Sequence, residues 1–434
     1  MFLPIKSDKS ILALGSEFDT RLAFYKNGEI IFSENTGKIA ENYEKLEKFI
    51  FDFVETHCNV FLRNQIPDII ITDLHPLYNS RKIGEKLAEK FKIPHLIVQH
   101  HIAHIFSAVA DSLIHNTKYK IQDTDFYGIT CDGTGYGLDG NIWGGEVFRI
   151  SSKKISPRIN ANGAPFQSED NFWQLVNTAP REITRKKAWD RRCYCERIGH
   201  LEEQYLIGSE LAVEEPARML ISILSKFLSK KEIFQYVKKY YSAREFDLIW
   251  NQLEQKFNCP LSSSAGRVLD AVSILLGFCE NGRKYKHYPV KMLEENSEDC
   301  GNLPVKPKIT KNKNGEYILN TTELFKYLIE NINKTDQRGL GAVAQRYIIE
   351  GLYEIAGMDY KTPFNPPFEK GGKLKNVFFS GGLAENKIMK KFARENNIYV
   401  SKKIPSGDEG IAIGQIMAFL LFHPRNCQNN LAHL

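Results

Sequence analysis

The sequence predicts an α/β fold of two lobes, with mixed sheets flanked by helices and a helical subdomain in one lobe. Strand and helix patterns alternate over the first 110 residues, which is typical of a mostly parallel sheet. A strand, Gly turn, strand pattern near residue 11 returns about 115 residues later, which indicates a weak internal duplication. The 434 residues, 42% hydrophobic and 25% charged, are enough for two cores.

Lobe I is expected to span residues 1–122. Residues 11–33 predict three strands separated by polar turns, because they are rich in β-branched and aromatic residues. A helix (41–57), a strand (67–76), a helix (80–91) and a strand (93–100) follow. Asp73 and His75 end one of these strands. They lie either where α/β sheets bind ligands or in a simple turn before Pro76, and the sequence favours neither.

Lobe II is expected to span residues 123–408. The duplicated hairpin at 127–148 opens it, and a polar insertion at 151–200 interrupts it. Seven Arg or Lys residues at 181–197 predict a solvated surface, because no aromatic ladder for nucleic acid accompanies them. Residues 213–300 predict a helical part, and 362–373 an irregular surface loop. A final helix at 409–424 should return to lobe I, followed by a tail at 425–434.

Composition limits the class of protein. The net charge of +6 is mild and weakly favours an anionic small ligand. No apolar stretch is long enough for a bilayer, and the N-terminus lacks a secretory pattern, so we expect a cytoplasmic protein without membrane contact. The eight cysteines form no Cys-x-x-Cys pair, which argues against a zinc ribbon and a disulfide framework.

Two histidines give the first candidate site. In VQHHIAHIFSAVADS (98–112), His100 and His104 are four residues apart, so on a helix both would leave the same face. A core histidine is the ordinary alternative, and a His101–His104 pair is also open. Two imidazoles with one or two carboxylates would suit iron or zinc better than calcium.

Two glycine-rich turns give the second candidate site. Gly133, Gly135 and Gly137 follow Asp132 in a hairpin whose backbone could approach a phosphate. In VFFSGGLAEN, a buried strand ends at Ser380-Gly381-Gly382 before a helix, where free N–H groups could bind an anion. Asp408 precedes the final helix and could simply cap it.

Together these segments resemble a known family. The strings LGSEFD, TDLHPLY, VQHHIAH, CDGTGYGLDGNIWGGEVF, IGHLEEQYLIGSELAVEEPARML, CPLSSSAGRVLDAVSILLG, FFSGGLAEN and PSGDEGIAIGQ occur in the order of the C-terminal transferase region of HypF. HypF is the carbamoyltransferase family of [NiFe]-hydrogenase maturation. The resemblance covers residues 10 to 424 and implies an ASKHA-like (actin and sugar kinase) fold, shared with tRNA threonylcarbamoyl transferases and antibiotic O-carbamoyltransferases.

The resemblance also implies site residues. Iron or zinc, as one ion, would be held by His100, His104, Asp132 and Asp408, and of these His104 and Asp132 would be catalytic. Carbamoyl-adenylate, and AMP after transfer, would be held by two glycine-rich segments: Gly133, Thr134, Gly135, Gly145 and Glu146 in the first, and Ser380, Gly381, Gly382 and Asn386 in the second.

The function implied is transfer of carbamoyl from the adenylate to the C-terminal cysteine of a HypE-like protein. No counterpart of the family's acylphosphatase, zinc-finger or YrdC-like parts is recognised, so a separate YrdC-like protein would supply the adenylate. Residues 285–295 depart from the family pattern, as does SGGLAEN. The alternatives are transfer of carbamoyl or threonylcarbamoyl to a small molecule or tRNA, and a catalytically idle nucleotide-binding scaffold. Nucleic acid is otherwise not an expected partner.

Overall fold

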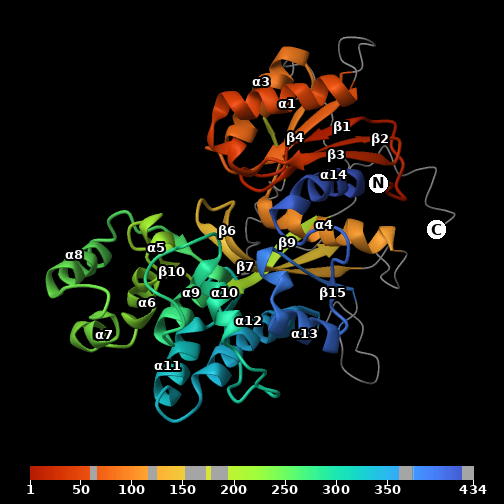
Figure 1. The fold of residues 1–434 in the computed structure, drawn as a ribbon. Coiled ribbons are helices and arrows are strands. Elements are labelled where there is room, and N and C mark those ends of the chain that lie inside the picture. Colours follow the sequence, from red (N-terminus) through yellow and green to blue (C-terminus); the bar gives the residue numbers. More distant parts are fainter. Residues whose placement is uncertain are drawn as a thin grey trace.

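The computed structural model describes residues 1–58, 66–115, 125–151, 173–176, 194–360, 374 and 376–422. These residues form five layers, in which two sheets alternate with three layers of helices (Figure 1). The red and orange N-terminal sheet lies at the top of the view and the second sheet below it, with α4 and α14 between them. Both lobes therefore share a helical middle layer.

The first sheet has the order β3-β2-β1-β4-β5-β8. β1 (Ile11–Ala13), β2 (Arg21–Lys26) and β3 (Glu29–Asn35) are an antiparallel meander, and β4 (Ile69–Asp73) and β5 (His95–Val98) continue parallel to β1. η1 (Gly37–Glu41) leads to α1 (Tyr43–Cys58), which with α3 (Asn79–Phe91) covers the outer face. Leu12, Ile70 and Ile83 are fully buried in this outer core.

The second sheet has the main order β12-β13-β9-β7-β6-β14-β15. β6 (Phe126–Tyr136), β7 (Ile142–Ser151) and β9 (Tyr194–Leu201) are antiparallel, and β14 (Val377–Ser380) and β15 (Tyr399–Val400) continue parallel to β6. This repeats the order and directions of β3-β2-β1-β4-β5, so the expected duplication is confirmed. β12 (Ile309–Lys311) and β13 (Tyr317–Leu319) extend one edge, and β10 (Gln204–Tyr205) pairs with β11 (Leu261–Ser262) beside β7.

The expected insertion at 151–200 needs a correction. Residues 194–201 form β9, the third strand of the duplicated meander, because their backbone pairs with β7. β8 (Trp173–Val176) pairs with β5 and extends the first sheet. Residues 152–172 and 177–193 lie outside the described residues, as do the expected loop at 362–373 and the tail at 425–434.

The middle layer consists of α4 (His100–Ile114) and α14 (Ile411–Phe422). α14 is apolar on all sides, as a helix enclosed by protein must be. It packs on α4 and on β1, β2 and β4, so the C-terminal helix returns to the first sheet. The two helices approach closely at Gly414, where an added Cβ would lie 1.8 Å from the carbonyl oxygen of Ala103.

The remaining helices lie on the other side of the second sheet. α9 (Ala265–Leu275), α12 (Gln337–Tyr360) and α13 (Lys387–Glu395) pack near the sheet, with α10 (Tyr288–Glu295) and α11 (Thr321–Asn331) beside them. α5 (Leu211–Glu214), α6 (Ala217–Leu224), α7 (Lys230–Val237) and α8 (Ala243–Glu254) extend to the left in Figure 1. Within the described part of the chain, no helix is both long and apolar enough to cross a membrane.

Candidate active site

Four side chains from both lobes converge where α4 begins. One ligand atom each of His100, His104, Asp132 and Asp408 lies within 4.8 Å of the other three. The Nε2 atoms of His100 and His104 lie 3.3 and 3.6 Å from Asp132 Oδ2, and each lies 3.7 Å from Asp408 Oδ1. The structure thus brings together all four residues that the resemblance named as metal ligands.

The two histidines are positioned by the start of α4. The Gln99 side chain caps this helix by accepting a hydrogen bond from the Ile102 amide (3.1 Å). His100 and His104 are then one turn apart, with their ring centroids separated by 4.7 Å. The His100 Nδ1 lies 2.8 Å from Asp73 Oδ2. If Nδ1 carries the proton for this bond, the Nε2 lone pair is directed at Asp132 and Asp408.

The carboxylates come from the equivalent end of the second lobe. Asp132 follows the regular part of β6, and its Oδ1 accepts a hydrogen bond from the Gly382 amide (3.2 Å). Gly381 makes that loop possible: its φ is +96°, and a Cβ would lie 2.4 Å from the Cys131 carbonyl oxygen. Asp408 begins η3 (Asp408–Gly410), directly before α14.

Electrostatic coupling within the cluster is strong. Burial opposes a charge on His100, but the neighbouring carboxylates, Asp73 foremost, raise its pKa well above the ordinary value. Against the effect of burial, His100 and His104 hold the pKa of Asp132 well below its usual range. Burial and the adjacent Asp132 raise the pKa of Asp408. A buried cluster of ionisable side chains with shifted pKa values is more typical of a functional site than of a hydrophobic core.

The donor set fits a metal ion. His104 is fully buried, yet among the described residues neither of its ring nitrogens has a hydrogen-bond partner, which is costly unless something else binds them. Two imidazoles and two carboxylates suit iron or zinc. The alternative pair with His101 is not supported, because His101 is not among the four residues whose ligand atoms converge, and its Nδ1 contacts Gln99 Nε2 (2.9 Å).

Part of the predicted nucleotide segment lies beside this cluster. Gly133 follows Asp132 and is half-buried, and Thr134 is exposed. Ser380 ends β14, Gly381 follows it, and Gly382 contacts Asp132 directly. The two glycine-rich turns therefore meet at Asp132, although they come from residues about 250 apart in sequence.

Four of the predicted nucleotide-binding residues already have partners within the protein. A Cβ on Gly135 would lie 2.4 Å from the His101 ring, and one on Gly145 would lie 2.6 Å from Leu201, so both glycines serve packing. Glu146 is fully buried, where it accepts a hydrogen bond from Ser263 and pairs with Arg197. Asn386 caps α13 through the amides of Ile388 and Met389. The partners of Gly135, Gly145 and Glu146 are distant in sequence, whereas Asn386 bonds residues that follow it closely.

Sequence reasoning missed two neighbours of the cluster. Burial and the nearby carboxylates of Asp73 and Asp408 raise the pKa of Tyr78 well above its ordinary value, so its hydroxyl remains a proton donor. Lys286 lies 3.6 Å from Asp408 Oδ2 and 2.7 Å from Asp19, and thereby joins the second lobe to the first. For Tyr78 the available signal was its place in TDLHPLY, and for Lys286 the departure at 285–295.

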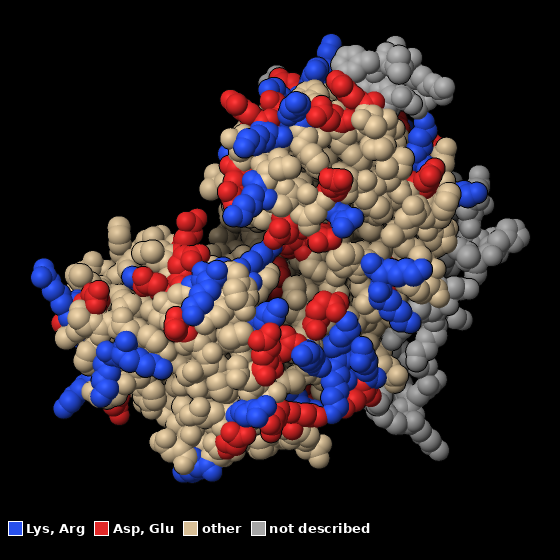
Figure 2. Space-filling model, viewed as in Figure 1, with Lys and Arg blue, Asp and Glu red and all other residues tan. Residues whose placement is uncertain are grey.

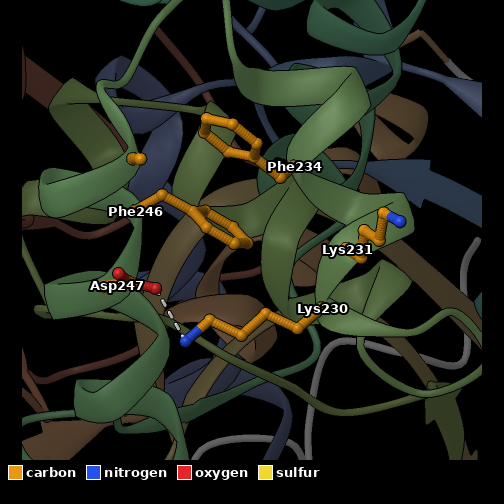
Figure 3. Close-up of a pocket in the computed structure, with 6 residues that line it drawn as sticks. Lys230, Lys231, Phe234, Phe246 and Asp247 are labelled. Carbon is orange, nitrogen blue, oxygen red and sulfur yellow. Dashed lines mark ion pairs between the residues drawn. The ribbon is translucent and has the colours of Figure 1, made fainter.

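A separate pocket of about 310 Å³ lies between α7 and α8. Phe234 and Phe246 form its apolar wall, and Lys230 pairs with Asp247 across it at 2.8 Å (Figure 3). It shares no residue with the four-residue cluster. The residues that line this pocket provide an apolar surface and one ion pair, and they do not form a ligand set for a metal.

Family models match both lobes. One, described as the HypF Kae1-like domain, matches residues 6–111. The other, described as the carbamoyltransferase Kae1-like domain, second subdomain, matches residues 128–168 and 189–415.

Individual relatives agree. A probable carbamoyltransferase HypF of Methanocaldococcus jannaschii is 35% identical over 96% of this chain and 47% of its own length. A carbamoyltransferase HypF homolog of Cupriavidus necator is 24% identical over 95% of this chain and 92% of its own length. The chain spans about half the length of the first curated relatives it matches.

Solved structures show the same fold. The crystal structure of T. kodakarensis HypF superimposes with a TM-score of 0.71 at 27% identity, over 97% of this chain and 48% of that chain. A full-length HypF in a phosphate- and nucleotide-bound form gives a TM-score of 0.74 at 24% identity, over 96% of this chain and 47% of that one. The expected ASKHA-like two-lobe fold is thereby confirmed.

Proposed function

The chain belongs to the HypF carbamoyltransferase family, and from this premise we propose that it transfers a carbamoyl group from carbamoyl-adenylate to the C-terminal cysteine thiol of a HypE-like protein. In this proposal a YrdC-like protein makes the adenylate, and the transfer takes place in the cytoplasm. The observation that carries it is the convergence of two imidazoles and two carboxylates beside a glycine turn.

In this proposal one iron or zinc ion is held by the four converging residues. When bound, the ion would act as a Lewis acid that stabilises negative charge on carbamoyl or phosphate oxygens. Asp73 would keep the His100 ring in place through the bond to Nδ1. The Gly382 amide would do the same for Asp132, which leaves the second carboxylate oxygen free to bind.

The transfer step balances without a redox partner. The acceptor sulfur attacks the carbamoyl carbon, a C–S bond forms, and the bond from that carbon to the phosphate oxygen breaks. AMP leaves with the electron pair of the broken bond, and the thiol proton passes to solvent. Because negative charge grows on the leaving phosphate, positive groups fixed beside it favour the transition state.

A reconstituted transfer reaction tests the proposal. Metal-loaded protein, a YrdC-like protein, carbamoyl phosphate, ATP and a HypE-like acceptor should together give a mass gain of one carbamoyl group on the terminal cysteine. Asp132→Asn keeps the shape but removes the charge, so it should abolish the gain. Asp139→Asn is the matched control, because Asp139 lies outside the cluster and bonds Trp143 instead.

The scaffold alternative predicts a different outcome of the same experiment. A complete mixture that leaves the acceptor unmodified, while the protein still binds acceptor and AMP, would contradict catalysis and favour the scaffold. The next experiment would then replace residues 285–295 with the sequence pattern that is usual in the family.

A further inference from the structure

Four large apolar side chains are exposed near the four-residue cluster. Phe18, Ile39 and Leu77 of the first lobe are 46%, 37% and 71% exposed, and Tyr285 of the second lobe is 45% exposed. Exposed apolar residues that are scattered singly need no explanation, whereas a group of them usually marks a contact surface. These four lie together, as the polar contacts around them show.

Hydrogen bonds join the three residues of the first lobe into one edge. Phe18 lies in the turn between β1 and β2, where the neighbouring Glu17 carboxylate accepts a hydrogen bond from the Asn79 amide (3.0 Å) at the start of α3. Leu77 is two residues before Asn79. The Asn79 side chain donates to the carbonyl oxygen of the residue after Ile39 (3.1 Å). The three apolar residues therefore lie on neighbouring connections of the first sheet.

An ion pair places Tyr285 beside this edge. Lys286 Nζ lies 2.7 Å from Asp19 Oδ2 and 3.6 Å from Asp408 Oδ2, so it joins the first lobe to a member of the cluster. Phe18 directly precedes Asp19, and Tyr285 directly precedes Lys286. Figure 2 shows a hollow between the upper lobe and the helical part at the left. The exposed apolar residues thus come from both lobes and flank an ion pair that contacts the cluster.

Aromatic rings continue this surface toward the histidines. The rings of His75 and Tyr78 are stacked, with their centroids 4.2 Å apart, and the Tyr136 ring meets His75 edge-on at 5.1 Å. The His75 amide donates to Asp73 Oδ1 (3.0 Å), while Oδ2 of the same carboxylate contacts His100. A path of apolar and aromatic side chains therefore leads from the exposed edge to the cluster.

The charges along this edge favour a protein as its occupant. Lys286 is already paired with two carboxylates, and Arg81 at the start of α3 pairs with Glu85 (3.0 Å) and donates to a backbone carbonyl oxygen. A nucleic acid needs cations that are free to contact its phosphates. Exposed apolar and aromatic side chains are instead typical of the centre of a protein interface. Lys38 and Lys82 also lie on η1 and α3, so tRNA is a second probe in the test.

We propose that Phe18, Ile39, Leu77 and Tyr285, the apolar rim, bind the acceptor protein through an apolar segment next to its reactive cysteine. The inference rests on the proposed function for the identity of the acceptor. A segment that carries a thiol to the cluster from the hollow passes this rim. Burial of apolar side chains on both partners would stabilise the complex and keep the segment extended toward the cluster.

Calorimetry of acceptor binding tests the rim. A HypE-like acceptor is titrated into the metal-loaded wild type and into Leu77→Asp. The dissociation constant should rise about 10- to 100-fold, because the variant places an unpaired charge against an apolar segment. Leu248→Asp is the matched control and should bind as the wild type does. Leu248 is a 63% exposed leucine of α8, in the helical part at the left of Figure 1.

Two further titrations identify the occupant and the second lobe's part in binding it. Tyr285→Ala should also weaken acceptor binding, because it shortens the rim from the side opposite Leu77. An acceptor that lacks its C-terminal segment should bind the wild type and Leu77→Asp equally weakly. Bulk tRNA should not bind in a way that depends on Leu77. Leu77 is so exposed that its replacement should leave the fold intact, which thermal unfolding verifies.

The outcomes separate the rim from the transfer reaction. Acceptor binding that is equal in the wild type and Leu77→Asp overturns the rim, and leaves the transferase proposal intact if the cysteine is still modified. Equal losses in Leu77→Asp and Leu248→Asp overturn it as well, because they mean a general effect of charge. Binding of tRNA that Leu77→Asp abolishes, without binding of the acceptor, replaces the protein occupant by a nucleic acid. Binding that depends on the rim, in a complete mixture that leaves the cysteine unmodified, supports the rim and contradicts the transfer.

Discussion

Asp73 decides which nitrogen of His100 faces the other ligands, because its carboxylate lies 2.8 Å from Nδ1. Asp73→Asn keeps an oxygen there but loses the charge. We expect the metal dissociation constant to rise about 10- to 100-fold, the usual effect of losing a partner of a ligand histidine. Competition with a chromophoric chelator measures it, with Asp139→Asn as control. An unchanged constant would mean that Asp73 only ends its strand.

His95 should make the fold sensitive to acid. Burial, followed by the charge of Arg81, lowers the pKa of His95 to about 4 from 6.5, while its Nε2 lies 2.7 Å from Thr72 Oγ1. The folded state thus favours the neutral ring, so this contribution to stability is complete above pH 6.5 and is lost as the pH falls toward 4.

The effect of pH is measured by comparison with His95→Gln. Between about pH 7.5 and 5, the free energy of unfolding of the wild type should fall by about 2 kcal/mol more than that of the variant. His200, whose pKa burial also lowers to about 4, titrates in both proteins and cancels. Parallel pH curves would contradict the assignment.

At the scale of elements, the contact between α4 and α14 holds the two lobes together. Gly414→Ala would place a Cβ 1.8 Å from the Ala103 carbonyl oxygen, so the helices must separate. We expect urea denaturation to show a loss of about 3 kcal/mol or more in the free energy of unfolding. Gly339→Ala in α12, where a Cβ would meet nothing within 4 Å, should instead be neutral or stabilising by up to about 1 kcal/mol. Equal effects would contradict this packing.

Elements with a strong local pattern were predictable. The alternation of β4, α3, β5 and α4 follows from apolar periodicity and helix signals within each segment. β9 was not predictable, because the polar residues before it hide a strand that is defined by its pairing with β7 and β13. Periodicity describes a segment's own faces, whereas the pairing of a strand depends on partners that are distant in sequence.

At the scale of the whole molecule, the duplication explains where the site lies. β5 leads into α4, which begins at His100, and β15 leads into η3, which begins at Asp408 and continues directly into α14. The two sheets repeat one topology, so equivalent chain positions bring ligands to the same junction. Spacing in the sequence could suggest the histidine pair, but the carboxylates were known only through family resemblance, because a turn such as that at Asp408 is locally an ordinary cap.

The residues of the glycine-rich segments show the same limit of predicting a site from the sequence. The sequence marks Gly135, Gly145 and Gly381 alike, yet only the last has a positive φ, at the edge of the site. Glu146 was predicted to contact the nucleotide because of the motif in which it lies, but its partners Ser263 and Arg197 belong to other segments. Which glycine admits a ligand and which admits a neighbouring side chain is decided by tertiary packing.

Metal analysis of matched histidine variants tests the central claim, that both lobes contribute to one ion site, most directly. The wild type, loaded with iron or zinc and desalted, should retain one equivalent by elemental analysis. His104→Ala should lose most of it, because it removes a ligand. His101→Ala should retain it, since His101 faces Gln99 and Gly135. Equal retention by both variants, with the folds intact, would contradict the account.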